Sequence, residues 1–172
     1  MKIYLDTNVV STIAKDDHPD ESSALEKILE FHKIGRVQLV TSDLTRQEIQ
    51  KLNNPDYERK HKAIYNLLEN VPLVEAQRLY GFNTYGDRYT WISSPLIEED
   101  PTWLQLRSTG LDGTDAHHVM LAIKGNCEIF LTCDEKTILN KKVEIEKAFP
   151  SLRLFKPSTL VNDLDKPLIT SS

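Results

Sequence analysis

The chain has 172 residues, of which 40% are hydrophobic and 27% are charged, and its net charge at pH 7 is -5. This length suits one domain with a single core, and this composition excludes a disordered or fibrous protein. The negative charge argues against a protein that coats nucleic acid through many lysines and arginines. It is compatible with a site made of carboxylates and a bound cation.

The sequence carries no signal for export or membrane insertion. The apolar run in MKIYLDTNVV is too short for a secretion signal, and no stretch approaches the ~20 apolar residues of a membrane span. Cys127 and Cys133 are too few for a disulfide framework and do not form a CxxC pair. We therefore expect a cytoplasmic protein whose two thiols pack as small core residues.

The first half of the chain alternates between strand and helix patterns. Residues 2–5 predict a short strand, and the polar triplet at residues 6–8 is typical of a turn. Leu25, Ile28 and Leu29 have helical spacing, and Gly35 is a suitable stop for that helix. We further expect a strand at residues 37–41, a helix that carries Glu48 and is capped by Ser42, a helix at residues 57–69 and a strand at residues 71–74.

The second half begins with a longer segment at about residues 80–110 that has no regular pattern and is rich in aromatic residues. A helix is expected from residue 114 to about residue 124, because Ala116, Val119, Met120 and Ile123 would form one buried face. The remaining elements are expected to be a strand at residues 129–132, a helix at about residues 141–149, a strand at residues 153–155 and a short terminal helix.

This order of elements predicts a single α/β domain over residues 1–172, with three layers in which helices flank a central parallel sheet. Ligands of open parallel sheets bind outside the carboxyl ends of the strands. Asp6 directly follows the first strand, and Asp134 follows a late strand. We therefore expect both carboxylates to lie at the ligand-binding edge of the sheet.

Four acidic motifs occur in order along nearly the whole chain. They are LDTN at residues 5–8, TRQEIQKL at residues 45–52, GTDAHHVMLAIKGN at residues 113–126 and LTCDEK at residues 131–136. Each motif alone is weak, but their order and their placement on strand ends and helices resemble the pattern of the PIN domain family. That resemblance implies a three-layer α/β fold and a metal-dependent nuclease.

The resemblance also implies that the catalytic carboxylates Asp6, Glu48, Asp115 and Asp134 converge to hold Mg²⁺ or Mn²⁺. The chemistry agrees, because these cations prefer oxygen ligands and because four carboxylates would repel one another without a cation. Bound metal can activate water and stabilise charge on a phosphate. The sequence leaves open whether one or two ions act, and whether Asp115 or Asp134 accepts the proton of the attacking water.

Polar neighbours would support this cluster. We expect the amide of Asn8 to hold Asp6 in place, and the hydroxyl groups of Thr7 and Thr132 to reach water or phosphate. Asp112 precedes the third acid of the cluster by three residues, so it is either a helix cap or an accessory acid rather than the preferred ligand.

Two adjacent histidines, His117 and His118, also lie near the third acid. Hard cations favour oxygen ligands, so we expect each histidine to be a surface residue or a supporting group rather than a ligand. In the aromatic segment, Arg88, Trp91 and Arg107 are candidate RNA contacts, because rings and guanidinium groups bind single-stranded RNA. The alternative is that this segment packs onto the domain or binds a partner.

We therefore expect an endoribonuclease that hydrolyses RNA phosphodiester bonds. Its size resembles that of a VapC-like toxin of a type II toxin–antitoxin pair, which would be a homo-oligomer inhibited by a small antitoxin. The alternatives are a free-standing RNA-processing nuclease and a noncatalytic PIN-like module for RNA binding or assembly. A phosphatase with an aspartyl nucleophile fits poorly, because Asn8 stands where its second acid is expected.

Overall fold

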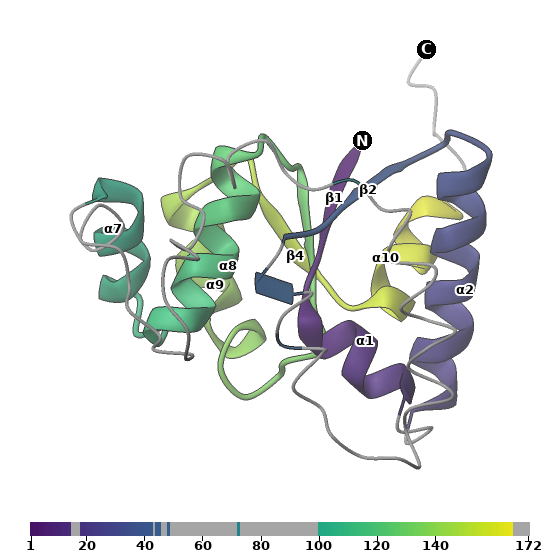
Figure 1. Ribbon diagram of the computed structural model, residues 1–172, viewed down its shortest axis with the longest axis horizontal. Coiled ribbons are helices and arrows are strands. Elements are labelled where there is room, and N and C mark those ends of the chain that lie inside the picture. The colour runs from purple at the N-terminus through teal and green to yellow at the C-terminus, as the bar shows by residue number, and fades with distance from the viewer. Residues whose placement is uncertain (15–17, 43, 46–47, 49–71, 73–99, 167–172) are drawn as a thin grey trace, which may run out of the picture.

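A parallel sheet forms the centre of the domain, and four of its strands lie within the part of the chain that the structure describes (Figure 1). The computed structural model describes residues 1–14, 18–42, 44–45, 48, 72 and 100–166. Within these residues the strand order is β2-β1-β3-β4, and each neighbouring pair is parallel. The strands are β1 (Lys2–Leu5), β2 (Gln38–Val40), β3 (Ile129–Leu131) and β4 (Arg153–Phe155).

Helices cover both faces of this sheet because successive side chains of a strand point to opposite sides. Ile3 and Leu5 of β1 pack in one core with α1 (Thr7–Ala14), α2 (Pro19–Lys33) and α10 (Pro157–Leu164). Tyr4 points into the other core. That core contains residues of α7 (Pro101–Ser108), α8 (Gly113–Lys124) and α9 (Lys142–Ala148), the last of which follows the short 3₁₀ helix Leu139–Lys141.

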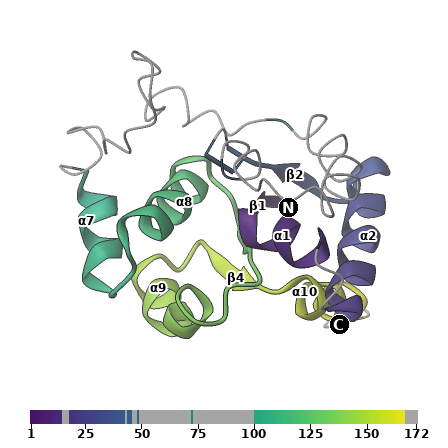
Figure 2. The same ribbon diagram turned by 60° about the horizontal axis from the view of Figure 1, so that its bottom comes forward.

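Figures 1 and 2 show these two groups of helices on opposite sides of the sheet. The expected three-layer α/β architecture is thus confirmed. The predicted helices before Gly35 and after residue 113 are also confirmed, as α2 and α8. Gly35 follows the end of α2 with φ of +74°, a left-handed conformation that glycine adopts at no steric cost. Of the predicted buried face of α8, Ala116, Val119 and Met120 are buried, and Ile123 is partly buried.

Two helices were not predicted. Within the triplet at residues 6–8, read as a turn, Thr7 and Asn8 instead form the start of α1. This helix buries Val9 and Val10 although its β-branched residues are weak helix formers. The segment at about residues 80–110, expected to be irregular, ends in α7. Asp100 caps this helix by accepting a hydrogen bond from the Thr102 N–H at 2.8 Å, and Pro101 occupies its first turn.

The predicted helix at residues 57–69 lies outside the described residues, as does most of the predicted strand at residues 71–74 and of the aromatic segment. From the predicted strand, the carbonyl oxygen of Pro72 accepts a hydrogen bond from the Thr41 N–H at 3.0 Å. No helix within the described ranges has the length and apolar character that a membrane span requires.

Candidate active site

Asp6 lies where the carboxyl ends of β1 and β3 meet. The side chain is buried, and its Oδ2 accepts a hydrogen bond from the Thr132 hydroxyl at 2.7 Å. Its Oδ1 accepts one from the Thr7 N–H at 2.8 Å. Burial raises the pKa of Asp6 above its usual value, while the nearby His118 and the Thr132 hydroxyl act in the opposite direction. The neighbouring strands β1 and β3 therefore place a buried carboxylate at the edge predicted for ligands.

Glu48 approaches this edge from a helical turn beyond β2. Ser42 caps that turn as predicted, because its Oγ accepts a hydrogen bond from the Thr45 N–H at 3.3 Å. The Oε2 atom of Glu48 accepts a hydrogen bond from the Thr7 hydroxyl at 2.5 Å and lies 3.1 Å from Nε2 of His118. Glu48 and Asp6 thus share Thr7 as a neighbour, so the first and second predicted acids do come together.

Asp115 occupies the first turn of α8, and Asp112 is the cap of this helix. Oδ1 of Asp112 accepts a hydrogen bond from the Asp115 N–H at 2.9 Å, which supports the cap as the role of Asp112. Oδ2 of Asp115 is buried and has no hydrogen-bond partner among the described residues. Burial raises the pKa of Asp115 to about 6, and the negative charges of Asp112, Asp6 and Asp134 add to this effect.

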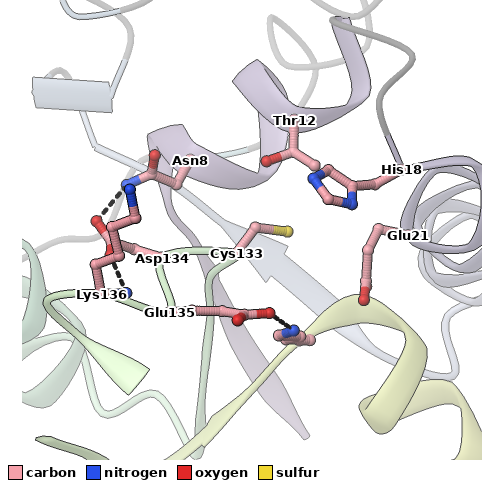
Figure 3. Close-up of a pocket in the computed structure, with 9 residues that line it drawn as sticks. Asn8, Thr12, His18, Glu21, Cys133, Asp134, Glu135 and Lys136 are labelled. Atoms are coloured by element: carbon pink, nitrogen blue, oxygen red, sulfur yellow. Dashed lines mark hydrogen bonds and ion pairs between the residues drawn. The ribbon is translucent and has the colours of Figure 1, made fainter. Parts of the chain in front are cut away.

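Asp134 follows β3 and is held mainly by backbone groups. Its Oδ1 accepts hydrogen bonds from the N–H groups of Lys136 at 3.0 Å and Thr137 at 2.8 Å. Its Oδ2 accepts one from Nδ2 of Asn8 at 3.3 Å (Figure 3). Asn8 was expected to hold Asp6, but its amide contacts Asp134 instead, because the start of α1 runs beside the end of β3.

Thr7 and Thr132 were expected to support the acid cluster, and their hydrogen bonds to two of its acids agree with that role. Both hydroxyl groups were expected to reach water or phosphate, yet they donate hydrogen bonds to Glu48 and Asp6 respectively. Oγ1 of Thr132 additionally accepts a hydrogen bond from the Asp134 N–H at 3.0 Å. Thr132 therefore connects the acid that follows β1 with the acid that follows β3.

The structure adds a buried residue that the sequence analysis did not single out. Tyr4 stacks on Phe130 with ring centroids 5.3 Å apart, and its hydroxyl donates a hydrogen bond to Ser42 Oγ at 2.7 Å. The same hydroxyl lies 2.9 Å from Nδ1 of His118. The only hint in the sequence was the position of this tyrosine within β1, two residues before Asp6.

His118 lies between two of the acids. Its Nε2 faces Glu48, and its Nδ1 is 3.9 Å from Oδ1 of Asp6. Burial alone would lower the pKa of His118, but the hydrogen bond and charge of Glu48, together with the charge of Asp6, raise it above the usual value. His117 and His118 are both buried, so the expectation of surface histidines was wrong. For His118 the alternative expectation, a supporting group, agrees with these contacts.

The acidic side chains of this edge offer oxygen donors, the kind of ligand that a hard divalent cation prefers. Within the described ranges, no group of three or more histidine, cysteine, aspartate or glutamate side chains has the spacing of a metal site. Two observations still fit a hard cation: the buried, unpartnered Oδ2 of Asp115, and the neighbouring carboxylates whose charges raise the pKa of Asp115. Mg²⁺ and Mn²⁺ prefer oxygen ligands, and a bound cation would offset the repulsion between these carboxylates.

The candidate RNA contacts are only partly described. Arg88 and Trp91 lie outside the described residues. Arg107 donates a hydrogen bond to the Leu111 carbonyl, and its guanidinium lies 5.5 Å from the ring of Trp103. Trp103 itself packs against the core beneath α7 and α8. For Trp103 the packing alternative therefore applies, whereas Arg107 stays a predicted RNA contact.

A parallel α/β domain with acidic side chains gathered at the carboxyl edge of its sheet is compatible with a nuclease that uses a divalent metal. The comparisons with known proteins agree, since a family model described as PIN domain matches residues 3–143. The chain belongs to the PIN domain family, and thus to a superfamily of metal-dependent nucleases. Searches of curated proteins and of solved structures gave no significant match.

Proposed function

We propose that this chain is an endoribonuclease that hydrolyses RNA phosphodiester bonds with Mg²⁺ or Mn²⁺ as cofactor. Asp6, Glu48, Asp115 and Asp134 would hold the metal. The observation that carries the proposal is the buried Oδ2 of Asp115, which has no hydrogen-bond partner among the described residues while other carboxylates act on it electrostatically. A buried acceptor without a partner is costly, so a ligand for it is expected.

The four acids would not have equal roles. Bound metal would lower the pKa of water and stabilise charge on the phosphate. Both oxygens of Asp134 already accept hydrogen bonds, whereas Asp115 keeps Oδ2 available and has a pKa of about 6. Between these two candidates, Asp115 is therefore the better acceptor for the proton of the attacking water.

Within this function we propose the more specific role of a toxin in a type II toxin–antitoxin pair. The support is the small size of the chain together with a family match over residues 3–143. A toxin of this kind would act in the cytoplasm as a homo-oligomer and would be inhibited by a small antitoxin. A short neighbouring reading frame whose product binds the chain and stops cleavage supports this role. If no protein encoded by a neighbouring reading frame inhibits cleavage, the chain would instead be an RNA-processing enzyme.

The test of the activity is incubation of pure protein with mixed single-stranded and structured RNA, with Mn²⁺, with Mg²⁺ and with a chelator. We expect internal cleavage only with metal, and products with 5′-phosphate and 3′-hydroxyl ends, because water attacks rather than the 2′-hydroxyl group. Cleavage that continues in chelator, or products with 2′,3′-cyclic phosphate ends, would overturn the mechanism. RNA binding without cleavage under all conditions would indicate the noncatalytic module.

A further inference from the structure

A pocket of about 390 Å³ opens beside Asp134 (Figure 3). This volume is within the range of about 300–1,000 Å³ that is typical of small-ligand sites. In Figure 3, Asn8 and Asp134 lie together at one end of the pocket, Thr12 and His18 lie together at another, and Cys133 lies between the two pairs. The remaining lining residues are Glu21, Glu135, Lys136 and Lys156.

This pocket adjoins the acid cluster rather than standing apart from it. Asn8 and Asp134 line the pocket, and the hydrogen bond between them forms part of its wall. Lys156 reaches the pocket from the residue after β4. The carboxyl ends of β1, β3 and β4 therefore surround the pocket, which is the usual location of ligands in a parallel sheet. If a polymer bound with one of its linkages at the acids, the unit next to that linkage would lie in this pocket.

The acidic groups of the pocket are already engaged. Glu135 forms an ion pair with Lys156. The carboxylate of Glu21 accepts hydrogen bonds from the Ser158 N–H at 2.9 Å and the Ser158 hydroxyl at 2.7 Å. These contacts leave fewer oxygen atoms of the pocket lining open to accept hydrogen bonds from a ligand.

Hydrogen-bond donors also line the pocket. The Lys136 ammonium is exposed and forms no ion pair with any described residue. The His18 imidazole borders the pocket from the residue before α2, and the Thr12 hydroxyl, which interacts with the Cys133 thiol, borders it from the body of α1. A cation beside hydroxyl and imidazole groups suits a phosphate that is joined to a sugar and a base.

We infer that this pocket binds the nucleotide of single-stranded RNA next to the cleaved phosphate. Lys136 contacts the phosphate of that nucleotide, and Thr12 and His18 contact its sugar and base. This inference rests on the proposed function, since it assigns a substrate subsite to the same enzyme.

The test measures binding of a six-nucleotide single-stranded RNA in chelator, where metal-dependent cleavage does not occur. The variants are Lys136→Ala and Thr12→Val, the latter of which removes a hydroxyl group but keeps the side-chain shape. The matched control is Lys33→Ala, because Lys33 is an exposed lysine at the opposite end of α2 from the pocket. Stabilisation of every variant by Mn²⁺ is measured in parallel by thermal unfolding.

We expect Lys136→Ala to weaken RNA binding about five- to tenfold and to lower the salt slope by about one, as for the loss of one phosphate contact. Thr12→Val should weaken binding about two- to fivefold, a smaller loss because a neutral hydrogen bond is weaker than a charged one. Lys33→Ala should bind as the wild type does, and all variants should keep the wild-type response to Mn²⁺.

Equal losses in Lys136→Ala and Lys33→Ala would overturn the inference, since they would show a general charge effect. Unchanged binding in both pocket variants would overturn it as well, while metal-dependent cleavage by the wild type would leave the proposed function standing. A wild-type protein that is neither stabilised by Mn²⁺ nor active on RNA would overturn the proposed function, and the subsite with it.

Discussion

Nε2 of His118 lies 3.1 Å from Oε2 of Glu48, and Nδ1 of the same ring lies 2.9 Å from the hydroxyl of Tyr4. The imidazole therefore joins β1 and α8 to the turn that carries Glu48. Because each ring nitrogen of the buried imidazole has a partner, the ring is fixed in orientation, and it fixes the Glu48 carboxylate in turn. Supporting contacts of this kind typically change metal affinity or activity by about 10- to 100-fold when they are removed.

The first prediction concerns Tyr4→Phe, which removes the hydroxyl but keeps the ring that stacks on Phe130. We expect a loss of about 1–3 kcal/mol in unfolding free energy, because Ser42 and His118 lose a buried partner. We also expect about tenfold weaker Mn²⁺ binding, because Glu48 would be less well oriented. Titration with Mn²⁺, followed by thermal unfolding, measures both effects.

Phe130→Leu is the matched control for this prediction. It removes the stacked ring beneath Tyr4 without touching the hydroxyl, so it should reduce stability while leaving the affinity for Mn²⁺ close to that of the wild type. If both variants lose Mn²⁺ affinity equally, the effect is one of general destabilisation, and the positioning role of Tyr4 and His118 is wrong.

The second prediction is a pH dependence of stability in chelator. The pKa of Asp115 is raised from 3.8 to about 6 in the folded protein. Because the folded state binds more protons than the unfolded state between these values, the favourable contribution of this group is present below pH ~4 and is lost as the pH rises through about 6. Asparagine does not ionise, so the Asp115→Asn variant does not lose stability in this way. Its melting temperature should rise by a few degrees relative to that of the wild type between pH 4 and pH 7.

Asp163→Asn is the control of opposite sign. A hydrogen bond from Lys166 lowers the pKa of Asp163, so its contribution is present above the unfolded pKa and is lost as the pH falls through the folded pKa. Relative to the wild type, this variant should lose stability rather than gain it as the pH rises, with a small effect because the pair is exposed. A wild type and an Asp115→Asn variant with parallel pH profiles would contradict the raised pKa.

The positions of the acids followed from the sequence because strand periodicity and motif order determine which residues follow the strands. Asp6 and Asp134 are examples, since each lies just beyond a strand that was predicted correctly. The partner of Asn8 did not follow, because it depends on β1 being the neighbour of β3, and this order is set by tertiary packing. The helix α1 was missed for a similar reason. Its Val9 and Val10 have weak helix propensity, and burial against the sheet stabilises the helix.

The roles of Tyr4 and His118 could not be predicted for a related reason. Tyr4 fits the strand pattern of β1 as an ordinary core residue, and His118 fits the helical pattern of α8. The contact between Tyr4 and His118 joins residues 114 positions apart in the sequence, and the contact between His118 and Glu48 joins residues 70 positions apart. No local pattern encodes a contact of this length, so only the folded structure shows it.

The last prediction is that Asp6→Asn abolishes cleavage while the fold survives. Asparagine keeps the size of aspartate, and its carbonyl oxygen can still accept one of the two hydrogen bonds that Thr132 and the Thr7 N–H donate. The negative charge is lost, so the metal would lose a carboxylate ligand. Removal of a supporting group costs about 10- to 100-fold, and loss of a ligand should reduce the cleavage rate by about a hundredfold or more.

Melting curves with and without Mn²⁺ distinguish this loss from misfolding. Burial raises the pKa of Asp6, which means that its charge is unfavourable in the metal-free protein, so Asp6→Asn should melt at or above the wild-type temperature in chelator. A ligand at about 100 times its Kd stabilises the folded state by about 2.7 kcal/mol, or roughly 5–10 °C for a domain of this size. The wild type should show this shift with Mn²⁺, and the variant should show a smaller one. Equal shifts in both proteins, or cleavage by the variant at the wild-type rate, would mean that Asp6 is not a metal ligand.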